Sequence, residues 1–444
     1  MKQALADLPI PHLPVERELL DNGMRLCISS RPGAPVVAML LHIRGGVGEE
    51  PEGKEGLAFL AGATLDQGTQ RHDDEQIAAL LEPAGGVVSG DAFGLNGAIN
   101  GGDWKLLLEM MGELACTPVF PAEKVERQRA RVIERLRVEA EDPAARASKS
   151  FRELVYGTHF LGRPQTGTPE SLARIEVEDL RGHHARAWCG RRATLVVCGD
   201  VDARAVARAA RRAFRTLDAG RPEELRDGPY PPIERRLAVH PMQREQAHLY
   251  FGHLGVRYAH PDYARLVVLD HVLGTGHGFT NRIGRRLRDE QGLAYAVHAS
   301  IHATASRYPG AFTAYIGTAP ENVEAALRGF LEEVRRIREE PVSRAELQLA
   351  QDYLVGSYAL SFERSSERAQ YLLSAELFGL PPDHLQRLVE SFRSTTAADV
   401  LAAARTHLHP EQASLAAAGP VERNSLERAL RRAGAATRSG RRRR

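Results

Sequence analysis

The order of predicted strands and helices in this chain occurs twice. Residues 193–202 (ATLVVCGDVD) have the pattern of a strand and turn, and residues 413–422 (ASLAAAGPVE) have the same pattern at an offset of 220 (413 − 193). Ala122-Glu123 opens a charged helix, and Ala345-Glu346 opens another at an offset of 223 (345 − 122). Two matches in the same order at similar offsets indicate a duplicated unit. The chain is therefore expected to fold as two copies of one α+β unit.

Length and composition agree with two domains. The 444 residues exceed what one hydrophobic core usually supports, and 43% hydrophobic with 26% charged residues is typical of a soluble globular chain. Residues 220–232 are rich in glycine, proline and charge, as a linker is. We expect an N-terminal domain at 1–222, a C-terminal domain at 223–436 and a disordered basic tail at 437–444. Each domain is expected to be a mainly antiparallel sheet with helices packed on one face.

Charge and hydropathy exclude several classes of protein. The net charge of +2, from 59 basic and 57 acidic side chains, indicates neither nucleic acid nor a membrane surface as partner. No run approaches 18 apolar residues, and the first 20 residues contain acids and prolines where a secretory signal needs a continuous apolar segment. The four scattered cysteines are expected to be reduced. These features predict a cytoplasmic protein.

One apolar helix is predicted at residues 56–69 (GLAFLAGATLDQGT). It resembles the zinc helix Gly-x-Ala-His-Phe-x-Glu-His-x-x-Phe-x-Gly-Thr of the pitrilysin/insulinase-type peptidases, the inverted zincins. In that family the two histidines bind zinc and the glutamate is the general base. The frame is kept at Gly56, Ala58, Gly68 and Thr69. The zinc-binding and catalytic residues are not kept, because Phe59 and Ala63 replace the histidines and Gly62 replaces the general base.

The family's third zinc ligand is a glutamate in a later helix that ends near Asp-Pro, and residues 131–143 resemble this segment. The alignment places Arg135 at the ligand position, with Glu134 one residue away as the alternative. Phe59 and Ala63 offer no N, S or O ligand, which zinc requires. A guanidinium about 4 Å from a dication would also repel it by about 8 kcal/mol at an effective dielectric of 20. We predict that this chain binds no zinc.

The other histidines of the chain do not form a pattern typical of a transition-metal site. His271 and His277 flank a glycine turn and are the least implausible pair of ligands. Satisfied or solvated histidines are the alternative. We expect no transition-metal site and no cofactor bound by this chain.

Residues 281–297 (NRIGRRLRDEQGLAYAV) resemble the family's C-half signature Arg-Leu-x-x-x-Leu-Arg-x-x-x-Gly-Leu-Ala-Tyr-x-Val. In the family, the arginine that ends the helix and the tyrosine that opens the next strand bind the substrate's backbone carbonyls. Those positions are Arg288 and Tyr295. A guanidinium hydrogen bond contributes about 1.5–3 kcal/mol, and a preorganised donor to an oxyanion about 10² to 10³ in rate. The alternative is a surface arginine paired with Asp289 or Glu290, beside a half-buried strand tyrosine.

The resemblance covers residues 18–422 and implies an active site that is divided between two subunits. Such a chain is expected to be the catalytically incomplete subunit of a heterodimer, inactive alone, whose partner carries zinc on an intact His-x-x-Glu-His helix. Peptide substrate is expected to add as a strand at a sheet edge, with Gly274, Gly276 and Gly278 lining its path. A purely structural subunit of the same fold and a self-sufficient peptidase with shifted ligands are the alternatives. The sequence does not identify the peptide or the partner, and it does not separate homodimer from heterodimer.

Overall fold

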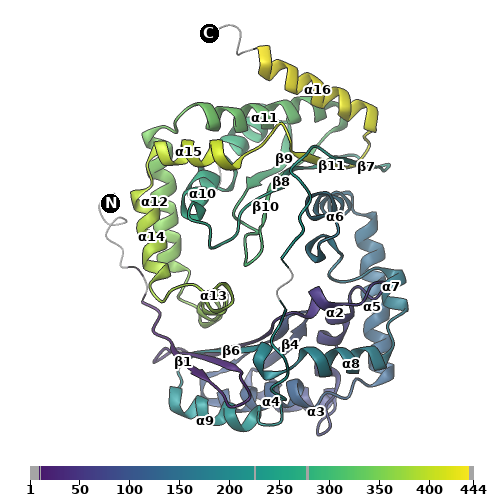
Figure 1. Ribbon diagram of the computed structural model, residues 1–444, viewed down its shortest axis with the longest axis vertical. Coiled ribbons are helices and arrows are strands. Elements are labelled where there is room, and N and C mark those ends of the chain that lie inside the picture. The colour runs from purple at the N-terminus through teal and green to yellow at the C-terminus, as the bar shows by residue number, and fades with distance from the viewer. Residues whose placement is uncertain (1–9, 11, 225–226, 277–279, 440–444) are drawn as a thin grey trace.

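The computed structural model describes residues 10, 12–224, 227–276 and 280–439. The chain forms two halves, each built on one sheet (Figure 1). Both sheets are mainly antiparallel, and each contains one parallel pair, β2 with β6 and β7 with β11. This confirms the α+β fold class with two repeated units.

The N-terminal half contains a six-stranded sheet in the order β1-β2-β6-β3-β5-β4. Its strands are β1 (Glu16–Leu19), β2 (Arg25–Ser30), β3 (Val36–Ile43), β4 (Val87–Asp91), β5 (Gly94–Asn100) and β6 (Ala193–Gly199). Its helices are α2 (Leu57–Gly62), α3 (Asp74–Leu81), α4 (Trp104–Cys116), α5 (Ala122–Glu141), α6 (Pro143–Tyr156), α7 (Pro169–Ala173), α8 (Val177–Ala187) and α9 (Ala203–Ala213). Apolar residues of α4 and α9 pack with those of β3 and β6 in one buried cluster.

The C-terminal half contains a five-stranded sheet in the order β7-β11-β8-β10-β9. Its strands are β7 (Leu237–Pro241), β8 (Ala247–Leu254), β9 (Ala294–Ser300), β10 (Ala311–Thr318) and β11 (Ser414–Gly419). Its helices are α10 (Tyr263–Asp270), the π-helices η7 (His271–Thr275) and η8 (Gly284–Glu290), α11 (Val323–Glu339), α12 (Arg344–Leu360), α13 (Ser365–Phe378), α14 (His384–Ser394), α15 (Ala397–His407) and α16 (Arg423–Ser439). Short 3₁₀ turns are η1 (Gly46–Glu49), η2 (Leu65–Gln67), η3 (Glu82–Ala84), η4 (Gly101–Asp103), η5 (Phe160–Gly162), η6 (Gly190–Arg192) and η9 (Pro320–Asn322).

The duplication extends to individual elements. Strands β2, β6, β3, β5 and β4 of the first sheet occupy the same order as β7, β11, β8, β10 and β9 of the second. The helix starts of α5 and α12 differ by 222 residues (344 − 122), and those of α9 and α16 by 220 (423 − 203). These offsets agree with the two found in the sequence.

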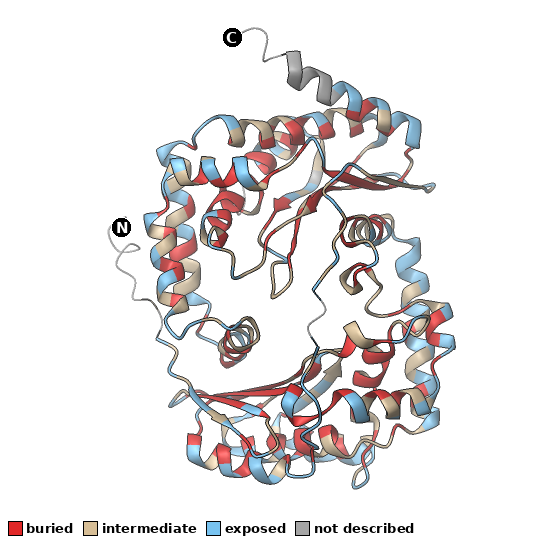
Figure 2. Ribbon diagram, in the orientation of Figure 1, coloured by how far each residue is buried: buried red, intermediate tan, exposed pale blue. Residues whose placement is uncertain are grey.

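The two halves exchange one helix each, which the sequence did not reveal. Helix α6 packs on the C-terminal sheet, and its counterpart α13 packs on the N-terminal sheet (Figure 1). Leu372 and Leu373 of α13 lie in one buried cluster with Leu40 and Val196 of the first sheet. Phe151 of α6 lies in another with Ala416 of the second sheet. The other half therefore covers the central strands of each sheet on their second face, and β3, β6 and β11 are mostly or wholly buried (Figure 2).

Local signals explain where several elements end. Asp142 separates α5 from α6 and caps α6, because its carboxylate accepts a hydrogen bond of 2.8 Å from the Ala144 backbone N–H.

Helix α16 runs to Ser439, three residues into the predicted tail, and residues 440–444 lie outside the described part. The four cysteines are free thiols. Within the described residues, no helix is both long and apolar enough to span a membrane.

Candidate functional site

Helix α2, the counterpart of a zinc helix, is anchored at its N-terminus by a buried carboxylate. Glu50 is 6% exposed, and its Oε1 accepts a hydrogen bond of 2.8 Å from the Ala58 N–H. The Gly56 N–H donates to the other oxygen at 3.3 Å. Burial raises the pKa of Glu50 to about 7, although both backbone bonds favour the ionised form. A carboxylate here satisfies free N–H groups at the positive end of the helix.

The position of the lost general base has no room for a side chain. A Cβ added to Gly62 would lie 1.8 Å from the backbone oxygen of Asp91 on β4. The contact is reciprocal, since a Cβ on Gly90 of the same strand would lie 2.1 Å from the Gly62 oxygen. Helix α2 therefore packs directly against the backbone of β4, and two facing glycines make this approach possible.

The positions of the first and third zinc ligands are adjacent in space. The Arg135 guanidinium on α5 lies over the Phe59 ring, 5.4 Å from its centroid. Arg135 also pairs loosely with Glu139 at 3.8 Å. Glu134, the alternative ligand, is exposed and pairs with Arg137 at 3.5 Å. Arg135 thus contacts α2, whereas the contact found for Glu134 is with Arg137; which of the two corresponds to the family's ligand stays a prediction.

The second histidine position is also occupied by a packing residue. Ala63 is half-buried, and its backbone oxygen lies 3.4 Å from Gln128 Nε2 of α5. Phe59, Gly62 and Ala63 carry no atom that coordinates a metal. The absence of zinc binding remains a prediction, supported by the aromatic, glycine and alanine side chains at these positions.

A cluster of three potential metal ligands lies in the C-terminal half, formed by His260, Asp262 and His407. Its groups already bond one another, since His407 Nε2 lies 2.9 Å from Asp262 Oδ2 and the Asp262 N–H donates to His260 Nδ1 at 3.1 Å. Arg265 occupies the other oxygen of Asp262 at 2.6 Å. Because the carboxylate bonds a cation and a histidine, the cluster is satisfied without a metal.

The glycine turn begins within the π-helix η7, which contains Gly274 and ends just before Gly276. Gly274 is buried, and a Cβ there would lie 2.5 Å from the Ala299 backbone nitrogen on β9. A Cβ on Gly276 would lie 2.7 Å from the His271 oxygen. Close packing thus explains both glycines without a bound peptide, and their place on a peptide path remains a prediction. His277 and Gly278 lie outside the described residues.

Arg288 lies on η8 and Tyr295 on β9, the edge strand of the second sheet. The Arg288 side chain is 35% exposed, and its Nε donates to Asp289 Oδ1 at 2.8 Å. The ion pair expected for a surface arginine is therefore present. The Tyr295 side chain lies outside the described part of the structure.

Comparison with known proteins agrees with this geometry. Residues 174–354 match the family model described as the Peptidase M16 inactive domain. The chain is 25% identical over 437 residues to an uncharacterized zinc protease of Mycobacterium tuberculosis, covering 95% of this chain and 97% of the relative. It is 24% identical over 380 residues to a non-peptidase homolog of Helicobacter pylori, covering 82% and 85%. A solved peptidase M16 inactive domain from Pseudomonas fluorescens has a TM-score of 0.85 at 22% identity, covering 92% and 99%.

The fold and the site define a class, a chain with two copies of one α+β unit, in which Phe59, Gly62 and Ala63 at helix α2 offer no side chain that binds a metal. By these comparisons the chain is similar to the peptidase M16 family, the family of pitrilysin and insulinase, which includes relatives described as zinc proteases and one described as a non-peptidase homolog.

Two features of the site had only faint signals in the sequence. Glu50 lies in an acidic loop with Glu49, Glu52 and Glu55, and nothing in that run marks it as the buried one. Gly90 lies opposite Gly62 in a strand of small residues. The need for glycine at this position is apparent only from the contact between α2 and β4.

Proposed function

We propose that this chain is the non-catalytic subunit of a peptidase complex, which binds peptide and completes the active site of a zinc-carrying partner. The partner would carry the intact His-x-x-Glu-His helix that this chain lacks. The observation that supports the proposal is the placement of the C-half signature, where the helix bearing Arg288 leads directly into the edge strand bearing Tyr295.

The open edge of β9 suits an extended peptide. Among the described strands, β9 pairs only with β10. A peptide added beside it would gain main-chain hydrogen bonds, with side-chain contacts setting its selectivity. Arg288 lies on η8, which precedes β9 in the chain, and in the proposed role its guanidinium exchanges Asp289 for a substrate carbonyl. A neutral carbonyl is a weaker partner than a carboxylate, so peptide binding must draw on the strand contacts as well.

The test is co-expression with a zinc-carrying M16 subunit from the same genome and an assay of cleavage across a fluorogenic peptide library. Arg288→Ala and Tyr295→Phe are expected to lower kcat/KM by about 10² or more without loss of the complex. Arg285→Ala is the matched control, since Arg285 is an exposed arginine of the same helix that pairs with Glu290 at 3.5 Å. Unchanged cleavage by both site variants would overturn the assigned roles.

The alternative is a structural subunit, in which the duplicated fold serves assembly alone. It is distinguished by the same assay, because it requires the partner's stability to depend on this chain while Arg288 and Tyr295 have no effect.

A further inference from the structure

Both π-helical segments in the described part of the chain flank the glycine turn. Segment η7 includes Gly274 at the start of the turn, and η8 follows the turn and carries Arg288. π-Helix accounts for well under 1% of residues in globular proteins and is frequent at functional sites. A turn of π-helix contains one more residue than a turn of α-helix. Specific contacts must therefore hold the segment in the π conformation and prevent its relaxation to an α-helix.

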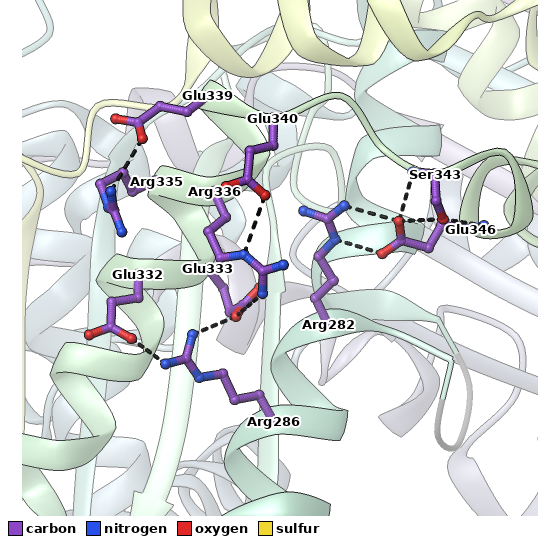
Figure 3. Close-up of polar contacts among 10 residues, drawn as sticks. All are labelled: Arg282, Arg286, Glu332, Glu333, Arg335, Arg336, Glu339, Glu340, Ser343 and Glu346. Atoms are coloured by element: carbon purple, nitrogen blue, oxygen red, sulfur yellow. Dashed lines mark hydrogen bonds and ion pairs between the residues drawn. The ribbon is translucent and has the colours of Figure 1, made fainter. Parts of the chain in front are cut away.

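Arg282 fixes the chain just before η8. Its side chain is 7% exposed, and its Nε and Nη2 donate to the two oxygens of Glu346 at 2.7 and 3.0 Å (Figure 3). Glu346 is held in turn by Ser343 at the N-terminus of α12, in a capping box. Burial opposes ionisation of Glu346, yet the bonds from Arg282 and Ser343 lower its pKa to about 2. A bidentate pair of this kind fixes direction as well as distance.

Arg286 fixes the chain within η8. Its Nη1 donates to Glu333 at 2.7 Å and its Nη2 donates to Glu332, both on α11 (Figure 3). Glu333 is 1% exposed and also accepts a bond from Arg336 at 3.1 Å. Removing Arg286 would leave a buried carboxylate with less compensation, which is costly.

An apolar contact holds the same turn. Leu287 is fully buried against α11, where a Cβ on Gly329 would lie 2.2 Å from Leu287 Cδ2. Arg286 and Leu287 thus secure the segment itself to α11, and Arg282 secures the chain just before it to α12.

We propose that Arg282 and Arg286 are positioning residues that hold residues 284–290 in the π register and thereby direct Arg288. This inference rests on the proposed function. A change from π to α register removes one residue from the wide turn and rotates every later residue by about 100°. Arg288 is two residues beyond Arg286 and projects from the other side of the helix. Loss of either ion pair would therefore change the direction in which the Arg288 side chain leaves the helix.

The first test uses the free chain and hydrogen exchange. Arg282→Met and Arg286→Met are expected to speed amide exchange at residues 286–293 by about tenfold or more. Arg335→Met is the matched control, because Arg335 belongs to the same charged face of α11 but pairs with Glu339 at 3.2 Å and not with η8 (Figure 3). Unchanged exchange in both variants would overturn the proposal.

The second test uses the complex with the zinc-carrying subunit. Arg282→Met is expected to lower kcat/KM in the wild-type background and to have no further effect when Arg288 is already alanine, because both changes remove the same contact. If Arg282 had a purely structural role, Arg282→Met would lower kcat/KM by the same factor in both backgrounds. That result would overturn the positioning role. If Arg288→Ala alone has no effect, the proposed function fails. Positioning then fails with it, whereas the exchange data still report whether the ion pairs hold the π register.

Discussion

The Arg135 guanidinium lies 5.4 Å from the centroid of the Phe59 ring. The sequence comparison predicts these residues at the positions of the third and the first zinc ligand of the family. Their contact brings together two residues that are far apart in sequence, and their correspondence to ligand positions stays a prediction. The cation–π contact, worth about 0.5–1 kcal/mol at an exposed site, joins α2 to α5.

The first prediction concerns zinc. The purified chain is expected to contain well under one zinc per molecule, because the aligned ligand positions hold phenyl, methyl and guanidinium groups. Metal analysis after dialysis measures it. One zinc per chain together with chelator-sensitive cleavage by this chain alone would contradict the expectation and would favour a shifted ligand set.

The second prediction concerns repair of the motif. The triple variant Phe59→His, Gly62→Glu, Ala63→His is expected neither to bind zinc tightly nor to cleave peptide, because any side chain at Gly62 meets the β4 backbone. Gly62→Ala alone should lower the free energy of unfolding by about 1–3 kcal/mol. Ala63→His, at a half-buried position, is the control and should cost less. A stable triple variant with bound zinc would show that α2 can move away from β4.

The third prediction is a pH dependence from Glu50. Its pKa is raised to about 7 from 4.5, so the folded state holds the proton more tightly than the unfolded chain. The stabilisation is complete below pH 4.5 and is lost as pH rises through 7. Glu50→Gln removes this dependence, so its stability relative to wild type should increase by about 3 kcal/mol between pH 4.5 and 8. Urea unfolding at both pH values measures it, with the exposed Glu52→Gln as the control.

The fourth prediction has the opposite sign and concerns buried histidines. Burial lowers the pKa of His183 and of His253 to about 4, because it disfavours the charged form. The unfolded chain binds more protons between pH 6.5 and 4, so stability is present above 6.5 and is lost as pH falls through 4. At His253 the ring donates to the Leu254 oxygen and accepts from the His409 N–H, which fixes the neutral form.

His253→Gln should therefore show a smaller loss of unfolding free energy between pH 6.5 and 4 than wild type, by about 3 kcal/mol. Urea titrations at a series of pH values measure it. His12→Gln, at an exposed position, is the comparison. An unchanged slope in the His253 variant would mean that the ring is protonated in the folded chain.

The sequence predicted those parts of the site that depend on residue type and order. The empty ligand positions and the C-half signature are local patterns, and the duplication follows from spacing. It did not predict the backbone contact of Gly62 with β4 or the bonds of Arg282 and Arg286, because these join segments that only the tertiary fold brings together. The exchange of α6 and α13 was missed for the same reason, since an amphipathic helix does not reveal which sheet it covers.

That exchange gives the last prediction. Cys27 and Cys198 of the first sheet are 1% and 0% exposed, and they share a buried cluster with Leu372 of α13. Leu372→Ala should lower the free energy of unfolding by about 2–5 kcal/mol, and it should also loosen α13 from a sheet that lies more than 170 residues away in sequence (372 − 198).

The readout is thiol labelling in native conditions, where Leu372→Ala should speed modification of both cysteines. Leu388→Ala is the matched control, because Leu388 is equally buried but belongs to the core of the C-terminal half. It should cost similar stability while leaving the two thiols protected. Equal labelling in the two variants would mean that the thiols report global unfolding, and that α13 does not independently shield the first sheet.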